Sequence, residues 1–292
     1  MPELPEVETI RRELEPLLKG RRIVGVNIQR PDIVGWPKPK EFRLRTAGLT
    51  ITGLDRRGKY LLLRTERRIP NAGCRTQSAE SKLNLLIIHL RLSGHLKVTD
   101  GRAPMQRFER IRFRLSGRRA LVFVEPRVLG RVYLVDENAL PPVLKGLREM
   151  GLEPIHRDFD ASYLKSRVRH RRSSIKGLLL DQSIAAGIGN IYSDEALFRS
   201  GVRPERPAHL LRKAEYSRLA RALREVLRDG IRHMGTTMSD SRYQRPKGMP
   251  GGFQKHLMVF DREGEPCRVC GTTIRSYRIG NRTSRYCPRC QH

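Results

Sequence analysis

Two pairs of cysteines near the end of the chain restrict its fold more than any other feature. Each pair has the spacing C-x-x-C, and sixteen residues separate Cys267 and Cys270 from Cys287 and Cys290. Four thiolates at this spacing form a tetrahedral zinc site, which leaves no open position for chemistry. The residues between the pairs read as a β-hairpin that turns at Gly280-Asn281. The sequence therefore predicts a zinc finger with one structural Zn2+ ion, and two disulfides are a poor alternative for an intracellular protein.

The chain carries a large excess of positive charge. Among 292 residues, Lys and Arg number 59 and Asp and Glu 30, a net charge of +29. The excess is spread along the sequence, which favours a folded protein that binds a polyanion, above all nucleic acid. The hydrophobic content of 38% is enough for a core in each of two domains. No apolar run approaches ~18 residues and no signal peptide pattern is present, so we expect no membrane span.

The first residues, MPELPEVET, offer a nucleophile. If Met1 is removed, Pro2 carries a free secondary amine, and α-amino groups titrate near ~7.7–8.0. Attack of such an amine on a sugar aldehyde carbon gives a cationic iminium, which drives elimination. Glu3 is placed to pass protons as a general acid or base. The alternative is an ordinary amphipathic helix, since apolar residues recur at helical spacing from Val7 until Gly20.

Strands are expected to follow, and then helices. Residues 22–65 read as strands, 67–81 as a loop that contains the fifth cysteine, Cys74, and 85–98 as two strands around a Ser-Gly turn. Residues 108–135 alternate like antiparallel strands around the turn EPRVLG. Beyond the turn-rich stretch 138–157 the pattern becomes helical.

The stretch IKGLLLDQSIAAGIGNIYSDEALFRSGV predicts two helices joined by a tight turn. Gly187 and Gly189 permit exposed backbone amides, and Asn190 opens the second helix. Amides at a helix N-terminus are suited to bind a phosphate, although Asn190 could instead serve only as an N-cap. A longer amphipathic helix follows over 213–234, and residues 235–254 read as a poorly ordered connector or a functional loop.

These motifs together resemble the formamidopyrimidine-DNA glycosylases, bacterial base-excision repair enzymes. The resemblance extends from PELPEVETIRREL through the two-helix stretch to the paired cysteines. It implies a bifunctional glycosylase and lyase that excises oxidised purines, 8-oxoguanine and formamidopyrimidines, from duplex DNA and nicks the strand by β,δ-elimination. It also implies a monomer that binds damaged double-stranded DNA, without a membrane, in the bacterial cytoplasm and at the nucleoid.

The resemblance assigns roles to individual residues. It implies that Pro2 is the nucleophile, Glu3 the acid, and Lys59 and Arg282 supporting catalytic groups. Phosphate contact is implied for His89, Arg171, Arg172 and Asn190. The resemblance also implies that Leu92, Arg127 and Leu129 form a probe, a group of side chains that enters the DNA duplex near the lesion. Without the resemblance, Lys59, His89 and Arg127 would pass for ordinary surface or strand residues.

Some positions depart from the family pattern. Leu92 and Leu129 occupy positions where the family commonly has methionine and phenylalanine, and Phe108 one where it often has histidine. Leucine fills space but cannot stack on a base, a contact worth ~1–3 kcal/mol in single-strand systems. We therefore expect weaker discrimination of the base opposite the lesion than is usual in the family. The family usually has a shorter connection at 67–81.

The sequence thus predicts an α+β protein with three parts. Residues 1–140 form an antiparallel β-sandwich with flanking helices, residues 155–260 a helical domain with a helix–two-turn–helix motif, and residues 261–292 a zinc-finger hairpin. One alternative is an endonuclease VIII-like glycosylase for oxidised pyrimidines, which the start PELPEVE argues against. A non-catalytic, zinc-containing DNA-binding protein is the other, and the Pro2-Glu3 terminus argues against it.

Overall fold

The computed structural model describes residues 2–68, 81–239 and 243–292, which divide into two compact units. The first unit contains Pro2 and residues 6–148 and 237–251, and the second contains residues 3–5, 149–236 and 252–292. Cys74 and most of the predicted loop 67–81 lie outside the described residues. The three-part division expected from the sequence stays a prediction.

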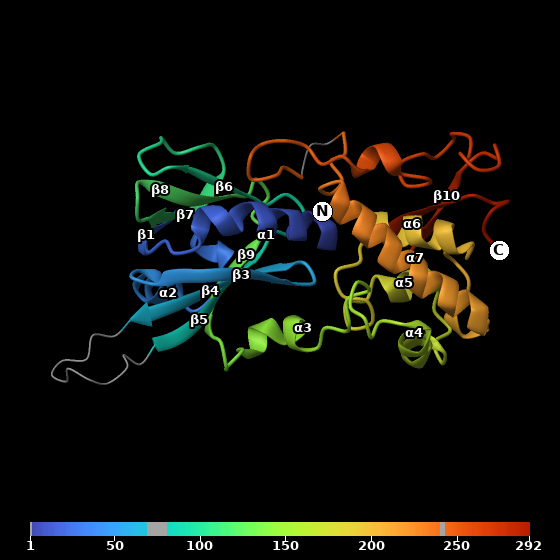
Figure 1. Ribbon diagram of the computed structural model, residues 1–292, viewed down its shortest axis with the longest axis horizontal. Helices are drawn as coiled ribbons and strands as arrows, with labels where there is room; N and C mark the ends of the chain where they lie inside the picture. Colours follow the sequence, from blue (N-terminus) through green and yellow to red (C-terminus); the bar gives the residue numbers. More distant parts are fainter. Residues whose placement is uncertain (1, 69–80, 240–242) are drawn as a thin grey trace. The chain divides into compact units, whose positions relative to one another are not determined.

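The first unit is a β-sandwich whose two sheets enclose the first helix of the chain (Figure 1). Its elements are α1 (Leu4–Leu18), β1 (Ile23–Ile28), β2 (Val34–Trp36), α2 (Pro39–Thr46), β3 (Thr50–Arg57), β4 (Tyr60–Arg68), β5 (Ser81–His89), β6 (His95–Asp100), β7 (Glu109–Leu115), β8 (Arg119–Val124), β9 (Arg131–Asp136) and α3 (Lys145–Arg148). One sheet has the order β1-β7-β8-β6 and the other β2-β9-β5-β4-β3. All neighbours are antiparallel except β2 and β9, which are parallel. This confirms the predicted sandwich.

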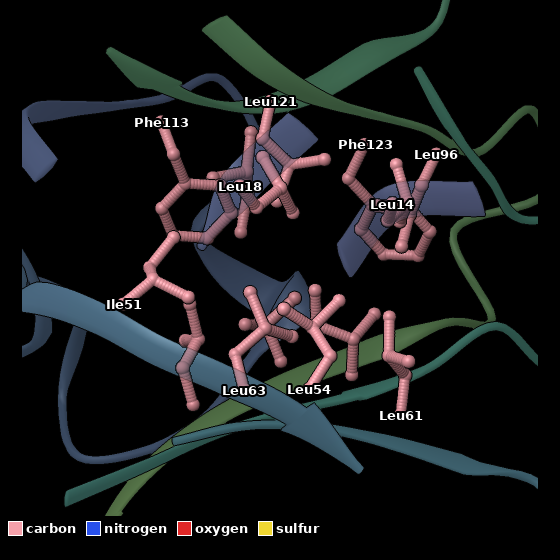
Figure 2. Packing of buried hydrophobic residues seen from close by; sticks show 14 of the residues in the cluster. Leu14, Leu18, Ile51, Leu54, Leu61, Leu63, Leu96, Phe113, Leu121 and Phe123 are labelled. Carbon is pink, nitrogen blue, oxygen red and sulfur yellow. The ribbon is translucent and has the colours of Figure 1, made fainter. Parts of the chain in front are cut away.

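The core of the sandwich lies between the two sheets. Figure 2 shows Leu96, Phe113, Leu121 and Phe123 from one sheet facing Ile51, Leu54, Leu61 and Leu63 from the other. Leu14 and Leu18 of α1 lie between these two groups (Figure 2). The helical spacing of the apolar residues in α1 therefore has a direct cause, since one stripe of the helix fills the core.

The expectation of strands throughout 22–65 is wrong for α2. Pro39 occupies the first turn, where its missing N–H costs nothing, and Phe42 is buried in the core. Most of the other α2 side chains are polar, so the helix shows almost no apolar stripe. The helical period is therefore too weak to be recognised in the sequence.

The second unit is helical and ends in the hairpin. Its elements are α4 (Ala161–Val168), α5 (Ile175–Leu179), α6 (Asn190–Ser200), α7 (Lys213–Arg232), β10 (Arg275–Ile279) and β11 (Arg282–Tyr286). The first of the two predicted helices is the short α5, and α6 is followed by Gly201, whose φ of 72° makes it a left-handed C-cap. The hairpin pairs Ile279 with Arg282 around the predicted turn Gly280-Asn281. None of the described helices is long and apolar enough to cross a membrane.

The stretch predicted as a connector over 235–254 is anchored in both units. Tyr243 is buried in the core of the first unit, where Arg245 donates to Glu13 through Nε at 2.6 Å. Phe253 stacks on Tyr192 in the second unit, with 5.5 Å between the ring centroids. Residues 240–242 lie outside the described part of the chain. The described parts of the stretch 235–254 are thus held by specific contacts.

Candidate functional site

The Glu3 carboxylate is bound by the first amides of α6. Oε2 accepts hydrogen bonds from Gly189 N at 2.7 Å and Tyr192 N at 3.4 Å, and Oε1 accepts one from Ile191 N at 2.9 Å. These amides have no partner within the helix, and the helix dipole adds to their attraction for an anion. A Cβ at Gly189 would lie only 2.4 Å from Glu3 Cδ, so glycine is required for this approach. Glu3 therefore caps α6 from more than 180 residues away in the sequence.

The residues around Glu3 are fixed by the same turn. Leu4 N donates to Gly187 O at 3.0 Å, and Gly187 has a φ of 86°, which favours glycine. Pro2 directly precedes Glu3 and is buried. The predicted nucleophile therefore sits one residue from a carboxylate that the fold holds at two oxygens. Lys59 lies in the two-residue turn between β3 and β4 and is 8% exposed.

Asp194 in α6 connects the helix to the zinc hairpin. Its Oδ1 lies 2.6 Å from Lys176 Nζ and accepts a hydrogen bond from Ser284 Oγ at 3.1 Å. Its Oδ2 accepts from Arg285 N at 3.1 Å, and Lys176 also donates to Thr283 O at 3.0 Å. Burial raises the pKa of Asp194 to about 6, an effect opposed by the ammonium of Lys176. Lys176 is absent from the site residues predicted above, although a lysine among the apolar residues of α5 indicates a buried ion pair.

Glu195, the next residue of α6, holds a different segment. Its carboxylate is fully buried and accepts hydrogen bonds from the backbone amides of Met258, Val259 and Phe260 at 2.8–2.9 Å. Burial raises the pKa of Glu195, and these three amides oppose the rise by stabilising the carboxylate. This segment leads into the first cysteine pair. Helix α6 therefore holds the chain before the zinc finger through Glu195 and the hairpin within it through Asp194.

Asn190 is the first residue of α6, and Gly189 is the N-cap. The N-cap is the residue that precedes the first helical residue, and Asn190 is itself the first helical residue. The simple N-cap role considered for Asn190 is therefore wrong. The Oδ1 atom of Asn190 is buried and makes no hydrogen bond to any residue that the structure describes. The expected phosphate contact of Asn190 remains a prediction.

The four paired cysteines gather at one point. Their Sγ atoms all lie within 4.8 Å of one another, with 3.9 Å between Cys267 and Cys290 and 3.4 Å between Cys270 and Cys287. Zn–S bonds of ~2.3 Å in a tetrahedron place sulfur atoms about 3.8 Å apart, so the set fits one structural zinc ion. Phe198 and Ile274 pack against the cluster. Arg282 begins β11 beside the hairpin turn and is exposed.

His89 is buried at the end of β5. Its Nδ1 accepts a hydrogen bond from Arg91 N at 3.1 Å, and its ring packs edge-on against Tyr60 at 4.4 Å between centroids. Burial, together with the positive charges of Arg91 and Lys59, lowers the pKa of His89 to about 3. The neutral ring then carries its proton on Nε2, which is a donor.

The expected probe residues lie on two loops of the first unit. Leu92 lies between β5 and β6, whereas Arg127 and Leu129 lie between β8 and β9. Arg127 is exposed and Leu129 is 39% exposed, so both are available to a ligand. Phe108 lies just before β7, where the guanidinium of Arg107 stacks 4.5 Å above its ring. Arg171 and Arg172 are exposed after α4 in the second unit.

Zinc content gives a direct test of the cysteine cluster. We predict about one zinc per chain by elemental analysis, and a large loss of zinc in Cys287→Ser, because three thiolates bind the ion far more weakly than four. The hairpin amides of the variant should then exchange faster with solvent. Cys74→Ser, which alters the fifth cysteine, is the control and should keep its zinc. Full zinc content in Cys287→Ser would contradict the assignment.

The lowered pKa of His89 predicts a loss of stability in acid. Below the ordinary pKa of 6.5 the unfolded chain binds a proton that the native ring does not, so the free energy of unfolding falls as the pH falls. The slope is about 1.4 kcal/mol per pH unit, or about 2 kcal/mol between pH ~6.5 and ~5. His89→Asn should remove this part of the pH dependence. Urea unfolding followed by the fluorescence of Trp36, the single tryptophan, measures it, and equal pH dependence in both proteins contradicts the prediction.

Three domain families match successive parts of the chain. Residues 1–132 match the formamidopyrimidine-DNA glycosylase N-terminal domain, residues 150–242 the formamidopyrimidine-DNA glycosylase H2TH domain, and residues 264–292 the zinc finger found in FPG and IleRS. A formamidopyrimidine-DNA glycosylase of Pelotomaculum thermopropionicum is 42% identical over 291 residues, which cover 100% of this chain and 99% of the relative. One of Moorella thermoacetica is 43% identical over 278 residues, 95% of each chain.

Solved structures agree with these matches. The MutM (Fpg) protein of Thermus thermophilus superimposes with a TM-score of 0.85 at 36% identity, covering 99% of this chain and 98% of that one. The Lactococcus lactis Fpg in complex with DNA containing an abasic site gives 0.85 at 30% identity, covering 99% of each chain. These similarities span both units and the zinc finger, and the chain therefore belongs to the formamidopyrimidine-DNA glycosylase family.

Proposed function

We propose that this chain is a bifunctional DNA glycosylase and abasic-site lyase of base excision repair. The observation that best supports the proposal is the anchoring of Glu3 on α6, with Leu4 held by Gly187. An N-terminal helix with a merely structural role does not need its third residue to be fixed by three amides. A reactive amine does need a fixed position, because proximity and orientation supply much of the rate of a covalent step.

The first step joins the protein to the sugar. With Met1 removed, the lone pair of the Pro2 nitrogen attacks C1′ of a nucleotide that has been turned out of the duplex. The Pro2 nitrogen loses its own proton, the bond from C1′ to the base breaks, and the base leaves with the electron pair and takes up that proton. Glu3 gives a proton to O4′ as the sugar ring opens, which leaves an iminium between Pro2 and C1′.

The second step cuts the strand. The iminium withdraws electrons from C2′, so a proton is lost there and the 3′ phosphate leaves as the β-substituent. A further elimination expels the 5′ phosphate, and hydrolysis of the iminium then returns the amine of Pro2. We assign proton transfer near the sugar to Lys59 and the binding of the flanking phosphate to Arg282, because guanidinium and phosphate pair through two parallel hydrogen bonds.

We infer that the substrates are oxidised purines, 8-oxoguanine and formamidopyrimidines, in duplex DNA. Related Fpg proteins of Lactococcus lactis have been solved with DNA that contains Fapy-dG or an abasic site. Leu92, Arg127 and Leu129 would fill the space left by the flipped nucleotide, and Arg127 has donors that match the edge of the opposite base. His89, Arg171, Arg172 and Asn190 would contact phosphates, which sets register without reading sequence.

The net charge of +29 suits a protein that works on DNA, since phosphate neutralisation supplies most of the non-specific affinity. We infer that the protein acts as a monomer in the bacterial cytoplasm, associated with the nucleoid through DNA. Four buried or half-buried thiols that bind zinc agree with a reducing compartment.

Glu3→Gln separates base removal from strand cleavage. A general acid contributes about 10²–10⁴-fold to its step, so the variant should lose base excision by roughly that factor. A preformed abasic site also exists as an open-chain aldehyde, which needs no proton from Glu3 on O4′, so its cleavage should fall by less than about tenfold. Single-turnover assays on a duplex with 8-oxoguanine and on one with an abasic site measure the two rates.

Because Glu3 also caps α6, the loss must be distinguished from misfolding. Affinity for a duplex that holds an uncleavable abasic analogue, and the thermal unfolding midpoint, serve as controls. The proposal expects the affinity to change little, whereas the midpoint should fall somewhat, because glutamine keeps one carbonyl acceptor for the α6 amides but places an NH2 donor against the others. Equal losses of base excision and abasic-site cleavage would contradict the role of Glu3 as the acid.

A further inference from the structure

Both loops that carry the expected probe residues cross from one sheet of the sandwich to the other. The loop 90–94 leaves β5 in the five-stranded sheet and enters β6 in the four-stranded sheet, and the loop 125–130 runs from β8 to β9 in the opposite sense. His89 pairs with Arg131, and His95 pairs with Val124. Each loop therefore starts and ends beside the other, although 35 positions separate His89 from Val124 along the chain.

One carboxylate connects the two loops. Glu125 is fully buried, and its Oε1 accepts hydrogen bonds from Ser93 Oγ at 2.5 Å and from Arg127 N at 3.1 Å. Its Oε2 accepts from Gly130 N at 3.1 Å. Ser93 is the neighbour of Leu92, and Arg127 and Gly130 enclose Leu129. The contacts of Glu125 thus reach both halves of the expected probe without using a probe side chain.

The surroundings leave this carboxylate little freedom. A Cβ at Gly130 would lie 3.1 Å from Glu125 Oε2 and 2.5 Å from the ring of Phe123, so only glycine fits there. On the outer side Arg110 donates through Nε to Glu125 O at 2.8 Å and through Nη2 to Pro126 O at 3.3 Å. A buried charge is stable only when it is hydrogen-bonded, so the loops must keep their donors on it.

Both loops also contain a residue in an unfavourable backbone conformation. Val128 has a φ of 56° and Arg91 a φ of 56°, and the left-handed region is especially unfavourable for a β-branched residue such as valine. Such conformations persist only where the surroundings determine them, and they gather at functional sites. The hydrogen bonds of Glu125 to Arg127 N and Gly130 N flank Val128 and supply that constraint.

We propose that Glu125 is a positioning residue that joins the loops 90–94 and 125–130 into one probe, so that Leu92, Arg127 and Leu129 enter DNA as a unit. The proposal rests on the proposed function. Leu129 cannot hold the base opposite the lesion by stacking, so discrimination of that base must come from the position of Arg127. Glu125 fixes that position through the backbone amide of Arg127. Glu125 acts through backbone amides and touches neither the lesion nor the reacting sugar.

Ser93→Ala tests the connection with the smallest change. It removes the hydrogen bond between the loops and leaves both bonds within the loop 125–130 in place. We expect the ratio of 8-oxoguanine excision opposite cytosine to that opposite adenine to fall roughly tenfold, the effect of one hydrogen bond to a charged group. Cleavage of a preformed abasic site under single-turnover conditions should stay within about twofold, because the amine and its acid are untouched.

Two further variants complete the experiment. Glu125→Gln replaces one acceptor with a donor and should lower the ratio at least as much, whereas Glu125→Asp, which keeps the charge, should restore part of it. Glu41→Gln is the matched control, because Glu41 is exposed and pairs only with Arg45 on α2 in the described contacts. Its ratio should equal that of the wild type.

Hydrogen exchange in the free protein gives a readout that needs no DNA. The amides of residues 125–130 should exchange faster in Ser93→Ala than in the wild type, with the rest of the sandwich unchanged. An unchanged excision ratio in Ser93→Ala overturns the inference, and so does an equal loss of excision and abasic-site cleavage. If the wild type does not excise 8-oxoguanine, the proposed substrate is wrong and the excision ratio cannot be measured. The exchange experiment then still tests the inference, because equal exchange of residues 125–130 in Ser93→Ala and the wild type overturns it.

Discussion

The hydrogen bonds between the Glu3 carboxylate and the first amides of α6 are the contact on which the proposed chemistry depends. An unpaired helix N-terminus offers donors and a positive dipole, and a carboxylate from the chain terminus satisfies both. The arrangement fixes the residue after Pro2, and thereby restricts where the Pro2 nitrogen can lie. A terminus that frays is the usual behaviour of a chain end, and here one carboxylate prevents it.

The same helix organises most of the second unit through buried acids. Asp194 holds Lys176 and the backbone of β11, and Glu195 holds the three amides of 258–260 before the first zinc ligand. Three carboxylates therefore bring the N-terminal residues, the hairpin and the zinc-finger approach to one helix of eleven residues. Basic residues outnumber acidic ones by 59 to 30, yet several of the acids lie in the interior, where they bind backbone amides. Glu125 does the same in the first unit for the loops 90–94 and 125–130.

Sequence reasoning recovered the features that depend on local spacing. The cysteine pairs predict the zinc cluster and the turn at Gly280-Asn281, and the apolar period of α1 predicts its buried stripe. It missed α2, whose single buried aromatic residue gives no period. The partners of the buried acids could not be predicted either, because they lie far away in the chain. Asp194 and Arg285 are 91 positions apart, and Ser93 and Glu125 are 32. An acid in the first half of a helix, or a glutamate in a turn, looks like an ordinary solvated charge until the fold brings its donors to it.

Reductive trapping tests the central claim that the reactive group is the amine before Glu3. Borohydride reduces an iminium to a stable amine, so an enzyme incubated with a duplex containing 8-oxoguanine should become covalently joined to the DNA. Proteolysis and mass spectrometry of the adduct identify the modified residue. We predict a single adduct on the nitrogen of Pro2, in a mature chain that lacks Met1. An adduct on the side chain of Lys59, or efficient strand cleavage by a chain that retains Met1, would contradict this claim.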